Sequence, residues 1–414
     1  MSARHFLFLQ GPTSPFFSKL GTRLIDNGHS VSRINFNVGD FVYWGKKPSW
    51  QFRESANTLP TYLEKLALEH KITDFIMLGD TRPVNAPARK VADKLNIRCH
   101  IFEEGYLRPN YLTLEEDGIN GYSPMPKSAK WYRSAAQAIE ESNDTTPVSN
   151  PMRLLALHEI GYHLPNLLNP IFYPGYKTHR PYISGLELAG WGIRFAKMPW
   201  YESQDKRVIQ RLLKDETPFY LLPLQLDSDS QIQTHSPFNS MLEVIETTLK
   251  SFAQHAPKNS QLVIKNHPLD TGFTPFRKYI STLARSLCIH GRVLYLESGN
   301  LVHLLNKTEG VVTINSTVGL TAIEHQCKTI TLSDPLYNIE QLTYQGSLDS
   351  FWHADFKPDM LLYTCFRKVL THCALINGGF YSQEGIAIGV ESAIQRFHMP
   401  ESPLETLCKR VPVS

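Results

Sequence analysis

Short apolar runs alternate with amphipathic stretches along about the first 110 residues, and this pattern predicts strands that alternate with helices. Strands are predicted at His5–Leu9, Val31–Phe36, Asp74–Asp80 and Arg98–Phe102. Helices are predicted at Phe16–Asn27, Leu59–His70 and Ala86–Leu95. A chain in which each strand is followed by a helix is typical of a doubly wound parallel sheet. The first part of the chain is therefore interpreted as a Rossmann-like domain.

A second set of strands and helices begins at Pro218–Gln225 and runs to the strand Lys328–Leu332. Residues 120–205 show weak periodicity and are rich in Pro, aromatic and basic residues, which indicates a helical insertion plus the linker. The predicted domains are 1–205, with the insertion at about 120–205, then 206–380, and a last segment 381–414 whose helix, about Glu384–Phe397, crosses back onto the first domain. The predicted fold class is α/β, with two Rossmann-like doubly wound domains facing a cleft, the arrangement called GT-B.

Two strands of the second domain end in polar residues, and these ends form a candidate ligand site. Leu262–Ile264 is followed by Lys265–Pro268, and Gly310–Ile314 is followed by Asn315–Thr317. In an open α/β sheet such residues face the crevice at the carboxyl ends of the strands, where ligands bind. The Asn-Ser-Thr segment also precedes a helix, whose first backbone N–H groups can hold a phosphate. The two motifs together favour a nucleotide-sugar site.

Each of these motifs also has a purely structural interpretation. The residue before a proline, here His267, adopts extended backbone whether or not a ligand is present. Ser316 and Thr317 would cap a helix equally well in the absence of a phosphate.

Paired carboxylates follow one strand in each predicted domain. Glu103 and Glu104 come at the end of the last strand of the first domain, and Asp227 and Asp229 follow the first strand of the second. Reactions at a sugar's anomeric carbon use two carboxylates, one as acid/base and one as nucleophile or electrostatic stabiliser. The alternatives are that the aspartates form a turn and that the glutamates pair with Arg108.

The composition is that of an ordinary globular protein and argues against a membrane-spanning or nucleic-acid-binding protein. Apolar residues make up 42% and charged residues 20% of 414 residues, and no window approaches the roughly 18 apolar residues that span a bilayer. The first apolar run is too short for a signal-peptide core, so a cytoplasmic location is expected. A net charge of +3 is too small to indicate nucleic-acid binding but permits contact with anionic lipid. The six cysteines form no CxxC pair and are expected to be reduced thiols.

The sequence resembles the β-Kdo transferase family of capsule polysaccharide biosynthesis and export, the KpsS type, over most of its length. Any one matching segment is weak, but they occur in the family's order. They are Leu9–Phe17, Ile34–Asp40, Glu103–Pro109, Leu224–Asp229, Lys265–Pro268 and Asn315–Leu320.

The resemblance implies a retaining transferase that takes the acidic sugar Kdo from CMP-Kdo. Asp229 would be the nucleophile, with Asp227 as the alternative, and Glu104 the acid/base residue, with Glu103 as the alternative. The residues implied for binding CMP-Kdo share the second domain: His267 and Lys265 for the phosphate or the Kdo carboxylate, Asn315, Ser316 and Thr317 for the phosphate, Glu324 for the ribose, and Gln225.

Residues at strand ends of the first domain are candidates for the acceptor side of the site. Gly11 would let backbone approach a ligand closely. The others are Asn37, Asp40, Arg82 and Arg108, and for Arg82 a surface salt bridge is an equally good interpretation.

The resemblance also implies partners. The expected acceptor is a phosphatidylglycerol-type lipid at the inner face of the cytoplasmic membrane, where other capsule assembly or export proteins are further candidate partners. Five aromatic and basic residues of the insertion would suit a membrane surface, namely Trp191, Arg194, Lys197, Trp200 and Tyr201. An ordinary packed insertion is the alternative. No nucleic acid, cofactor or metal is expected, although Asp227-Ser228-Asp229 is formally a DxD metal motif.

Two other functions remain open on the sequence. One is a GT-B enzyme that uses a different sugar nucleotide, either a transferase or an epimerase. The other is a non-catalytic capsule-export adaptor that retains the fold, which the several carboxylates and the histidine at strand ends disfavour.

Overall fold

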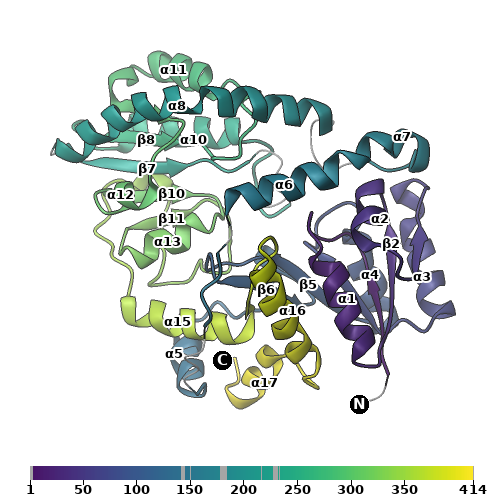
Figure 1. Ribbon diagram of the computed structural model, residues 1–414. Helices are drawn as coiled ribbons and strands as arrows, with labels where there is room; N and C mark the ends of the chain where they lie inside the picture. Colours follow the sequence, from purple (N-terminus) through teal and green to yellow (C-terminus); the bar gives the residue numbers. More distant parts are fainter. Residues whose placement is uncertain are drawn as a thin grey trace. The chain divides into compact units, whose positions relative to one another are not determined.

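The computed structural model describes residues 3–140, 145–149, 151–177, 184–215, 217–226, 232 and 234–413. The chain forms two compact units (Figure 1). Unit 1 comprises the residues up to Pro126, Ser134–Ser184 and Arg367–Ser414, and unit 2 comprises Lys127–Arg133 and Gly185–Phe366. The C-terminal segment therefore belongs to the same unit as the N-terminal strands. The boundary expected at residue 205 falls inside helix α8 (Ser184–Lys214).

Unit 1 is built on a sheet with the strand order β12-β6-β5-β4-β1-β2-β3. Strands β1 to β5 are parallel where they pair, and β6 is antiparallel to β5 and β12. The strands are β1 (His5–Phe8), β2 (Ser30–Asn35), β3 (Ser49–Gln51), β4 (Asp74–Leu78), β5 (Arg98–Glu104), β6 (Tyr111–Glu116) and β12 (Leu375–Asn377). The helices are α1 (Phe16–Asp26), α2 (Val38–Trp44), η1 (Ala56–Thr58), α3 (Leu59–Glu69), α4 (Ala86–Leu95), η2 (Asn120–Tyr122), α6 (Met152–His163), η3 (Pro165–Leu168), α7 (Asn169–Phe172), α16 (Gln383–Phe397) and α17 (Pro403–Arg410).

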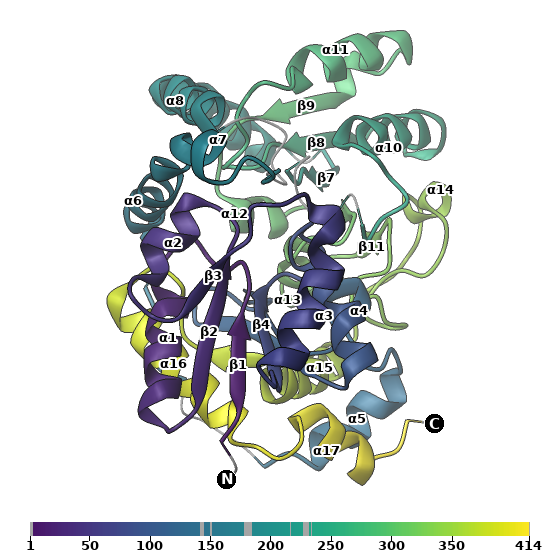
Figure 2. The same ribbon diagram turned by 90° about the vertical axis from the view of Figure 1, so that its right-hand side faces the viewer.

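Helices cover both faces of the unit 1 sheet (Figure 2). Successive side chains of a strand point to opposite faces. Phe6 and Phe8 accordingly pack with α1 and α16, whereas Leu7 packs with α3 and α4. Helix α1 turns Phe16, Leu20 and other apolar residues at helical spacing toward this core.

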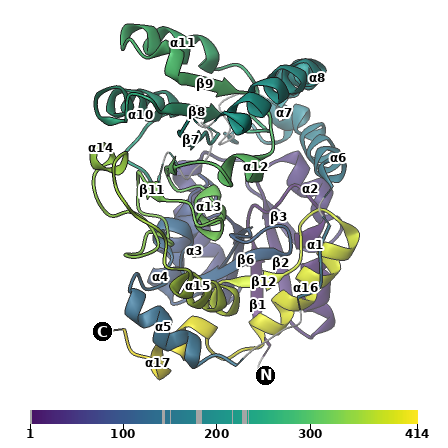
Figure 3. The same ribbon diagram turned by 90° about the vertical axis from the view of Figure 1, so that its left-hand side faces the viewer.

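Unit 2 is built on a sheet with the strand order β11-β10-β7-β8-β9, in which each pairing is parallel (Figure 3). Its strands are β7 (Phe219–Pro223), β8 (Gln261–Lys265), β9 (Val293–Leu296), β10 (Gly310–Thr313) and β11 (Thr329–Thr331). Its helices, besides α8, are α10 (Met241–His255), α11 (Phe276–Ser286), η4 (His290–Arg292), α12 (Leu301–Leu305), α13 (Val318–Glu324) and α14 (Leu348–Phe351). Helices α10 and α11 cover one face of the sheet, and α8, α12 and α13 cover the other. Helices α5 (Ala129–Gln137) and α15 (Met360–Cys373) contribute residues to both units.

Strand order places one topological switch point in each sheet, and ligands of open α/β sheets bind at such points. In unit 1 the chain leaves β1 toward β2 on one side and later resumes at β4 on the other. In unit 2 it leaves β7 toward β8 and later resumes at β10 on the other side. The loops that follow β1 and β4, and those that follow β7 and β10, are therefore where a site is expected.

The predicted α/β class with parallel sheets is confirmed, and so are the predicted strands of the first half, observed as β1, β2, β4 and β5. Helix α2 and the strands β3, β6 and β12 were not predicted. The six cysteines are unpaired in the structure. Across the described residues, no helix combines the length and the apolar character that crossing a membrane requires.

Strand β6 carries a buried carboxylic acid, Glu115, in the core of unit 1. Its Oε1 accepts a hydrogen bond from the Tyr106 hydroxyl (3.1 Å) and its Oε2 one from the Ser123 hydroxyl (2.5 Å). Burial raises the pKa of Glu115 to about 7, although both hydrogen bonds act to lower it.

The pKa of Glu115 predicts how the stability of unit 1 depends on pH. A carboxyl whose pKa is higher in the folded than in the unfolded state keeps its proton on folding at low pH, so stability falls as pH rises toward the folded pKa. Between pH 5 and 8 the wild type should lose about 2–4 kcal/mol more stability than Glu115→Gln, whose amide does not titrate. Denaturant unfolding at several pH values measures this difference. The exposed control Glu69→Gln should follow the wild type, and parallel curves for wild type and Glu115→Gln would contradict the assignment.

Candidate active site

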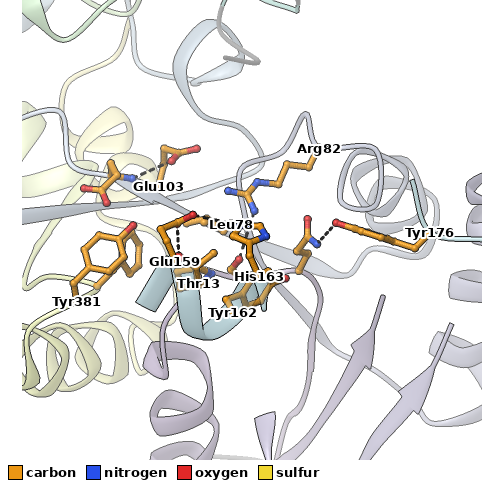
Figure 4. A pocket seen from close by; sticks show the side chains of 14 residues that line it. Thr13, Leu78, Arg82, Glu103, Glu159, Tyr162, His163, Tyr176 and Tyr381 are labelled. Carbon is orange, nitrogen blue, oxygen red and sulfur yellow. Dashed lines mark hydrogen bonds and ion pairs between the residues drawn. The ribbon is translucent and has the colours of Figure 1, made fainter. Parts of the chain in front are cut away.

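A pocket with a cavity volume of about 190 Å³ lies in unit 1 at the carboxyl ends of β1, β4 and β5 (Figure 4). The loop after β1 and the loop after β4 form part of its wall, which places the pocket at the switch point of this sheet. Its lining residues are Gln10, Gly11, Pro12, Thr13, Leu78, Arg82, Glu103, Glu104, Glu159, Tyr162, His163, Tyr176, Phe380 and Tyr381.

A buried asparagine joins the two loops of the switch point. The Asn85 side-chain amide donates to the carbonyls of Gln10 (3.2 Å) and Leu78 (2.8 Å), and its Oδ1 accepts from the backbone N–H of Gln10 (3.2 Å). Close packing shapes the same loops, because a Cβ at Gly11 would overlap the ring of Phe17. Gly79 has φ +68, a conformation that glycine adopts without strain.

Three carboxylates line the pocket, two from β5 and one from α6. Glu103 and Glu104 end β5, and Glu103 Oε1 accepts a hydrogen bond from the Glu104 backbone N–H (3.1 Å). Glu159 Oε1 accepts from the Thr13 hydroxyl (2.6 Å), and its Oε2 lies 3.3 Å from His163 Nε2, one helical turn further along α6. Figure 4 shows Thr13, Glu159 and His163 close together in the pocket wall. The pocket therefore contains carboxylates, which can accept a proton, and an imidazole beside one of them.

Neutral and cationic hydrogen-bond donors stand among these acids. Arg82 Nη1 lies 3.5 Å from the Gly11 carbonyl, and a Cβ built on Gly79 would meet Glu103 Oε2 at 3.3 Å and Arg82 Nε at 3.7 Å. Burial raises the pKa of Tyr381 well above its usual value, and Glu104 and Glu159 raise it further. The Tyr381 hydroxyl therefore keeps its proton at neutral pH and can donate a hydrogen bond.

Gln10, in the pocket wall, has a side-chain oxygen that accepts no hydrogen bond from the described residues. Its side chain is 2% exposed, and its Nε2 donates to the Tyr176 hydroxyl (3.1 Å). Its Oε1 has no hydrogen-bond partner within the part of the chain that the structure describes. A buried acceptor of this kind is unfavourable unless a ligand or water satisfies it. The pocket is thus suited to a hydroxyl-rich, polar ligand.

The predicted residues of the first domain divide between the pocket and other places. Gly11, Arg82, Glu103 and Glu104 line the pocket. Arg108 does not line it: its side chain is exposed, and its Nε donates to the Gly105 carbonyl (3.4 Å).

Asn37 and Asp40, the other two acceptor-side candidates, are completely buried beside the pocket and do not line it. Asp40 Oδ1 lies 2.5 Å from Arg33 Nη2 and accepts a hydrogen bond from the Tyr162 hydroxyl (2.8 Å). Asn37 caps α2 by accepting from the Asp40 backbone N–H (2.8 Å), and its Nδ2 donates to the Tyr162 hydroxyl (3.0 Å). Their contact with the pocket runs through Tyr162, which they hold in its wall.

In unit 2, Gln225 and Asn315 meet at the switch point. Gln225 follows β7, and its Nε2 donates to Asn315 Oδ1 (3.0 Å), while the Asn315 backbone N–H donates to Gln225 Oε1 (3.4 Å). Ser316 and Thr317, which were predicted to bind the phosphate of the sugar nucleotide, are partly exposed at the start of α13. Glu324 ends this seven-residue helix and is exposed.

Buried polar residues hold the loop that follows β8 and carries His267. The Leu269 backbone N–H donates to His267 Nδ1 (3.1 Å), so the neutral ring carries its proton on Nε2. Arg194 donates to the His267 carbonyl (3.2 Å) and pairs with Asp270 (2.8 Å) and Glu297 (3.3 Å). Arg194 is 5% exposed and belongs to this loop, so for this residue the structure favours the alternative of an ordinary packed insertion over a membrane-facing one.

Lys265 and the two predicted aspartates remain to be placed. Burial lowers the pKa of Lys265, at the end of β8, and the charge of Arg194 lowers it further. Asp227, Asp229 and the side chain of Trp191 lie outside the described residues. Among the described residues, no group of three or more His, Cys, Asp or Glu side chains could hold a metal ion.

Comparison with known proteins places the chain in a family. The family model described as "Capsule polysaccharide biosynthesis protein" matches residues 73–381. The chain belongs to this family. It is 34% identical over 382 residues to the capsule polysaccharide export protein KpsS of Escherichia coli, which covers 92% of this chain and 98% of KpsS. It is also 34% identical over 388 residues to the capsule polysaccharide modification protein LipB of Neisseria meningitidis serogroup B, covering 92% of this chain and 93% of LipB.

Among solved structures, Thermosulfurimonas dismutans KpsC is described as a beta Kdo 2,7 transferase. It aligns over 95% of this chain and 97% of its own chain, at 14% identity and a TM-score of 0.44.

Several residues that line the pocket of this family member were not identified from the sequence. They are Gln10, Thr13, Glu159, Tyr162, His163, Tyr176, Phe380 and Tyr381. Helix α6 supplies three of them, and it lies in the insertion whose periodicity is weak. The available signal was the spacing of Glu159 and His163, which places both on one face of a helix.

The buried pair of Arg33 and Asp40 predicts a large effect of mutation on stability. Asp40→Asn should destabilise unit 1 by about 3–5 kcal/mol, because it leaves the Arg33 charge buried without its counter-charge. Tyr162→Phe removes one hydroxyl from the same network and should cost only about 1–3 kcal/mol. Thermal or denaturant unfolding distinguishes the two. An Asp40→Asn variant as stable as the wild type would show that the pair does not hold α2 in place.

Proposed function

We propose that the protein is a retaining β-Kdo glycosyltransferase that uses CMP-Kdo and adds the first Kdo of a capsule linker to a phosphatidylglycerol or lysophosphatidylglycerol acceptor. It works in the cytoplasm, peripherally at the inner face of the cytoplasmic membrane. The observation that carries the proposal is the pocket at the unit 1 switch point, where Glu103 and Glu104 stand beside Arg82 in a member of a capsule biosynthesis family. The names of KpsS and LipB support a role in capsule export or modification.

Carboxylates suit sugar transfer because the transition state at the anomeric carbon resembles an oxocarbenium ion. We assign the nucleophile to Asp229, with Asp227 as the alternative. Its carboxylate forms a bond to the anomeric carbon of Kdo while the bond to the phosphate oxygen breaks, and CMP leaves with the electron pair. An acceptor hydroxyl then attacks the same carbon, releases the aspartate and gives its proton to a glutamate. We assign that acid/base role to Glu104, with Glu103 as the alternative.

Unit 2 offers groups that suit the CMP part of the sugar donor. We assign Lys265, at the end of β8, and His267, in the loop that follows it, to the CMP phosphate or the Kdo carboxylate. Gln225 and Asn315 lie at the switch point, where a nucleotide is expected in this type of sheet. We assign Ser316 and Thr317 to the phosphate and Glu324 to the ribose hydroxyls.

A transfer assay tests the reaction and its carboxylates together. Purified protein is incubated with CMP-Kdo generated in situ and a fluorescent lysophosphatidylglycerol, and the product is followed by mass spectrometry. Wild type should add the mass of one Kdo, and Asp229→Asn and Glu104→Gln should each lower the rate at least about 100-fold, as expected for loss of a nucleophile or of acid/base catalysis. The exposed control Glu391→Gln should stay close to the wild type. Full activity of Glu104→Gln would refute its role, and no transfer by the wild type would refute the proposed reaction.

The same assay in EDTA tests whether Asp227 and Asp229 serve chemistry or a metal. Activity retained in EDTA supports a carboxylate nucleophile. Loss of activity that magnesium restores would assign the DxD motif to a metal and overturn the glycosyl-aspartate step.

Binding of CMP tests the nucleotide site separately from transfer. CMP should raise the melting temperature of the wild type, because a ligand that binds only the folded state stabilises it. Lys265→Ala should weaken CMP binding about tenfold or more, since a hydrogen bond to a charged group is lost. The exposed control Lys258→Ala should bind normally. Equal CMP affinity in Lys265→Ala and wild type, measured by calorimetry, would exclude Lys265 from the site.

A further inference from the structure

The segment formed by α6, η3 and α7 exposes an unusual run of apolar side chains. Every exposed residue between Leu154 and Tyr176 is apolar. Ile171 is 74% exposed and Leu157 is 64% exposed. We call this surface the apolar face, and its residues are Ala156, Leu157, Ile160, Gly161, Leu164, Leu167, Leu168, Pro170, Ile171, Phe172 and Pro174.

The polarity of this segment is inverted relative to an ordinary surface helix, which buries its apolar side. Glu159, Tyr162 and His163 point inward and line the pocket. Asn166 Oδ1 accepts from the Gly39 backbone N–H (2.7 Å), and Asn169 Oδ1 accepts from the Val38 backbone N–H (2.9 Å). The polar side chains thus fasten the segment to the start of α2 and leave the apolar ones outside.

Charge around the apolar face favours one kind of occupant. Glu159 is the only carboxylate between Leu154 and Tyr176, and it is turned into the pocket. Exposed cations stand at both ends of the segment, Arg153 before it and Lys177 after it. An uncharged apolar surface with flanking cations and no exposed acid complements a leaflet of anionic phospholipid.

The neighbouring helix α2 also exposes apolar side chains next to a cation. It packs against α6 and η3 (Figure 2) and exposes Phe41 (50%) and Val42 (52%), with the exposed cation Lys46 just beyond its end. Large exposed apolar patches on proteins mark docking surfaces for proteins or membranes.

We propose that the apolar face docks unit 1 onto the surface of an anionic phospholipid bilayer. Its aliphatic and aromatic side chains enter the boundary between head groups and acyl chains, while Arg153 and Lys177 contact lipid phosphates. Helix α6 has the pocket on one side and the apolar face on the other, and a helix is only about 10 Å across. A lipid head group can therefore reach the pocket while its acyl chains stay in the bilayer. This last step rests on the proposed function, because it takes a lipid as the acceptor.

Flotation with lipid vesicles tests the docking surface without any sugar nucleotide. Wild type should bind phosphatidylcholine vesicles that contain phosphatidylglycerol, and binding should weaken with added salt and without the anionic lipid. The double variant Leu167→Gln/Ile171→Gln should bind at least about tenfold more weakly. The matched control Ile25→Gln/Leu68→Gln changes two exposed apolar residues elsewhere in unit 1, on α1 and α3, and should bind like the wild type.

Further outcomes separate the bilayer from other occupants. Failure of the wild type to bind vesicles, or equal loss in the variant and the control, would overturn the proposal. Dimerisation of the wild type in light scattering that is lost in Leu167→Gln/Ile171→Gln would instead identify the apolar face as a contact between two copies of the chain.

The acceptor assay separates a failure of docking from a failure of the proposed function. Leu167→Gln/Ile171→Gln should transfer Kdo normally to a short-chain, monomeric lysophosphatidylglycerol and poorly to the same lipid in vesicles. Vesicle binding without any transfer would keep the docking surface and reject the proposed reaction. Equal transfer by this variant and the wild type to both forms of the lipid would reject a role for the apolar face in reaching the acceptor.

Discussion

The buried ion pair between Arg33 and Asp40 is the interaction on which the candidate site depends. Both side chains are almost completely removed from water, so each charge requires the other and the hydrogen bonds around it. Asp40 also accepts hydrogen bonds from the Tyr162 hydroxyl and from the backbone N–H of Phe36. The pair therefore joins the end of β2 to α2 and to α6. Because α6 supplies one wall of the pocket and carries the apolar face, the pair positions both.

Strand order supplies the other constraint. Parallel strands send all their carboxyl ends to one edge, and reversal of the order at β1/β4 and at β7/β10 opens that edge to a ligand. Asn85 joins the two loops at the first switch point, and Gln225 with Asn315 joins those at the second. Each unit thus uses an uncharged amide to fix its loops. Charged groups are left to line the pocket or to end the strands.

The strands were predictable because buried parallel strands are continuous apolar runs that stop at polar residues. The same stops located Glu103, Glu104, Arg82 and Gly11 at the pocket. Helix α2 was missed because it is only seven residues long, and its start at Asn37 was interpreted as a strand-end ligand. A fully buried polar residue and a ligand-binding one look alike in a sequence, since both follow a strand.

The pocket residues of α6 were not predicted because the helix buries its polar side. Pattern analysis assumes that the apolar side of a helix is its buried side, and in α6 the buried side carries Glu159, Tyr162 and His163. The apolar and polar residues of the segment therefore gave only weak periodicity, and the sequence predicted a helical insertion plus the linker without identifying which side chains face a site. Sequences that conflict with their local structure concentrate at functional sites, because folding alone would not retain them. In this protein the conflict has two halves: polar groups turned inward to a pocket and apolar groups turned outward. The proposed ligand of the pocket would account for the first half, and the proposed docking to a bilayer for the second.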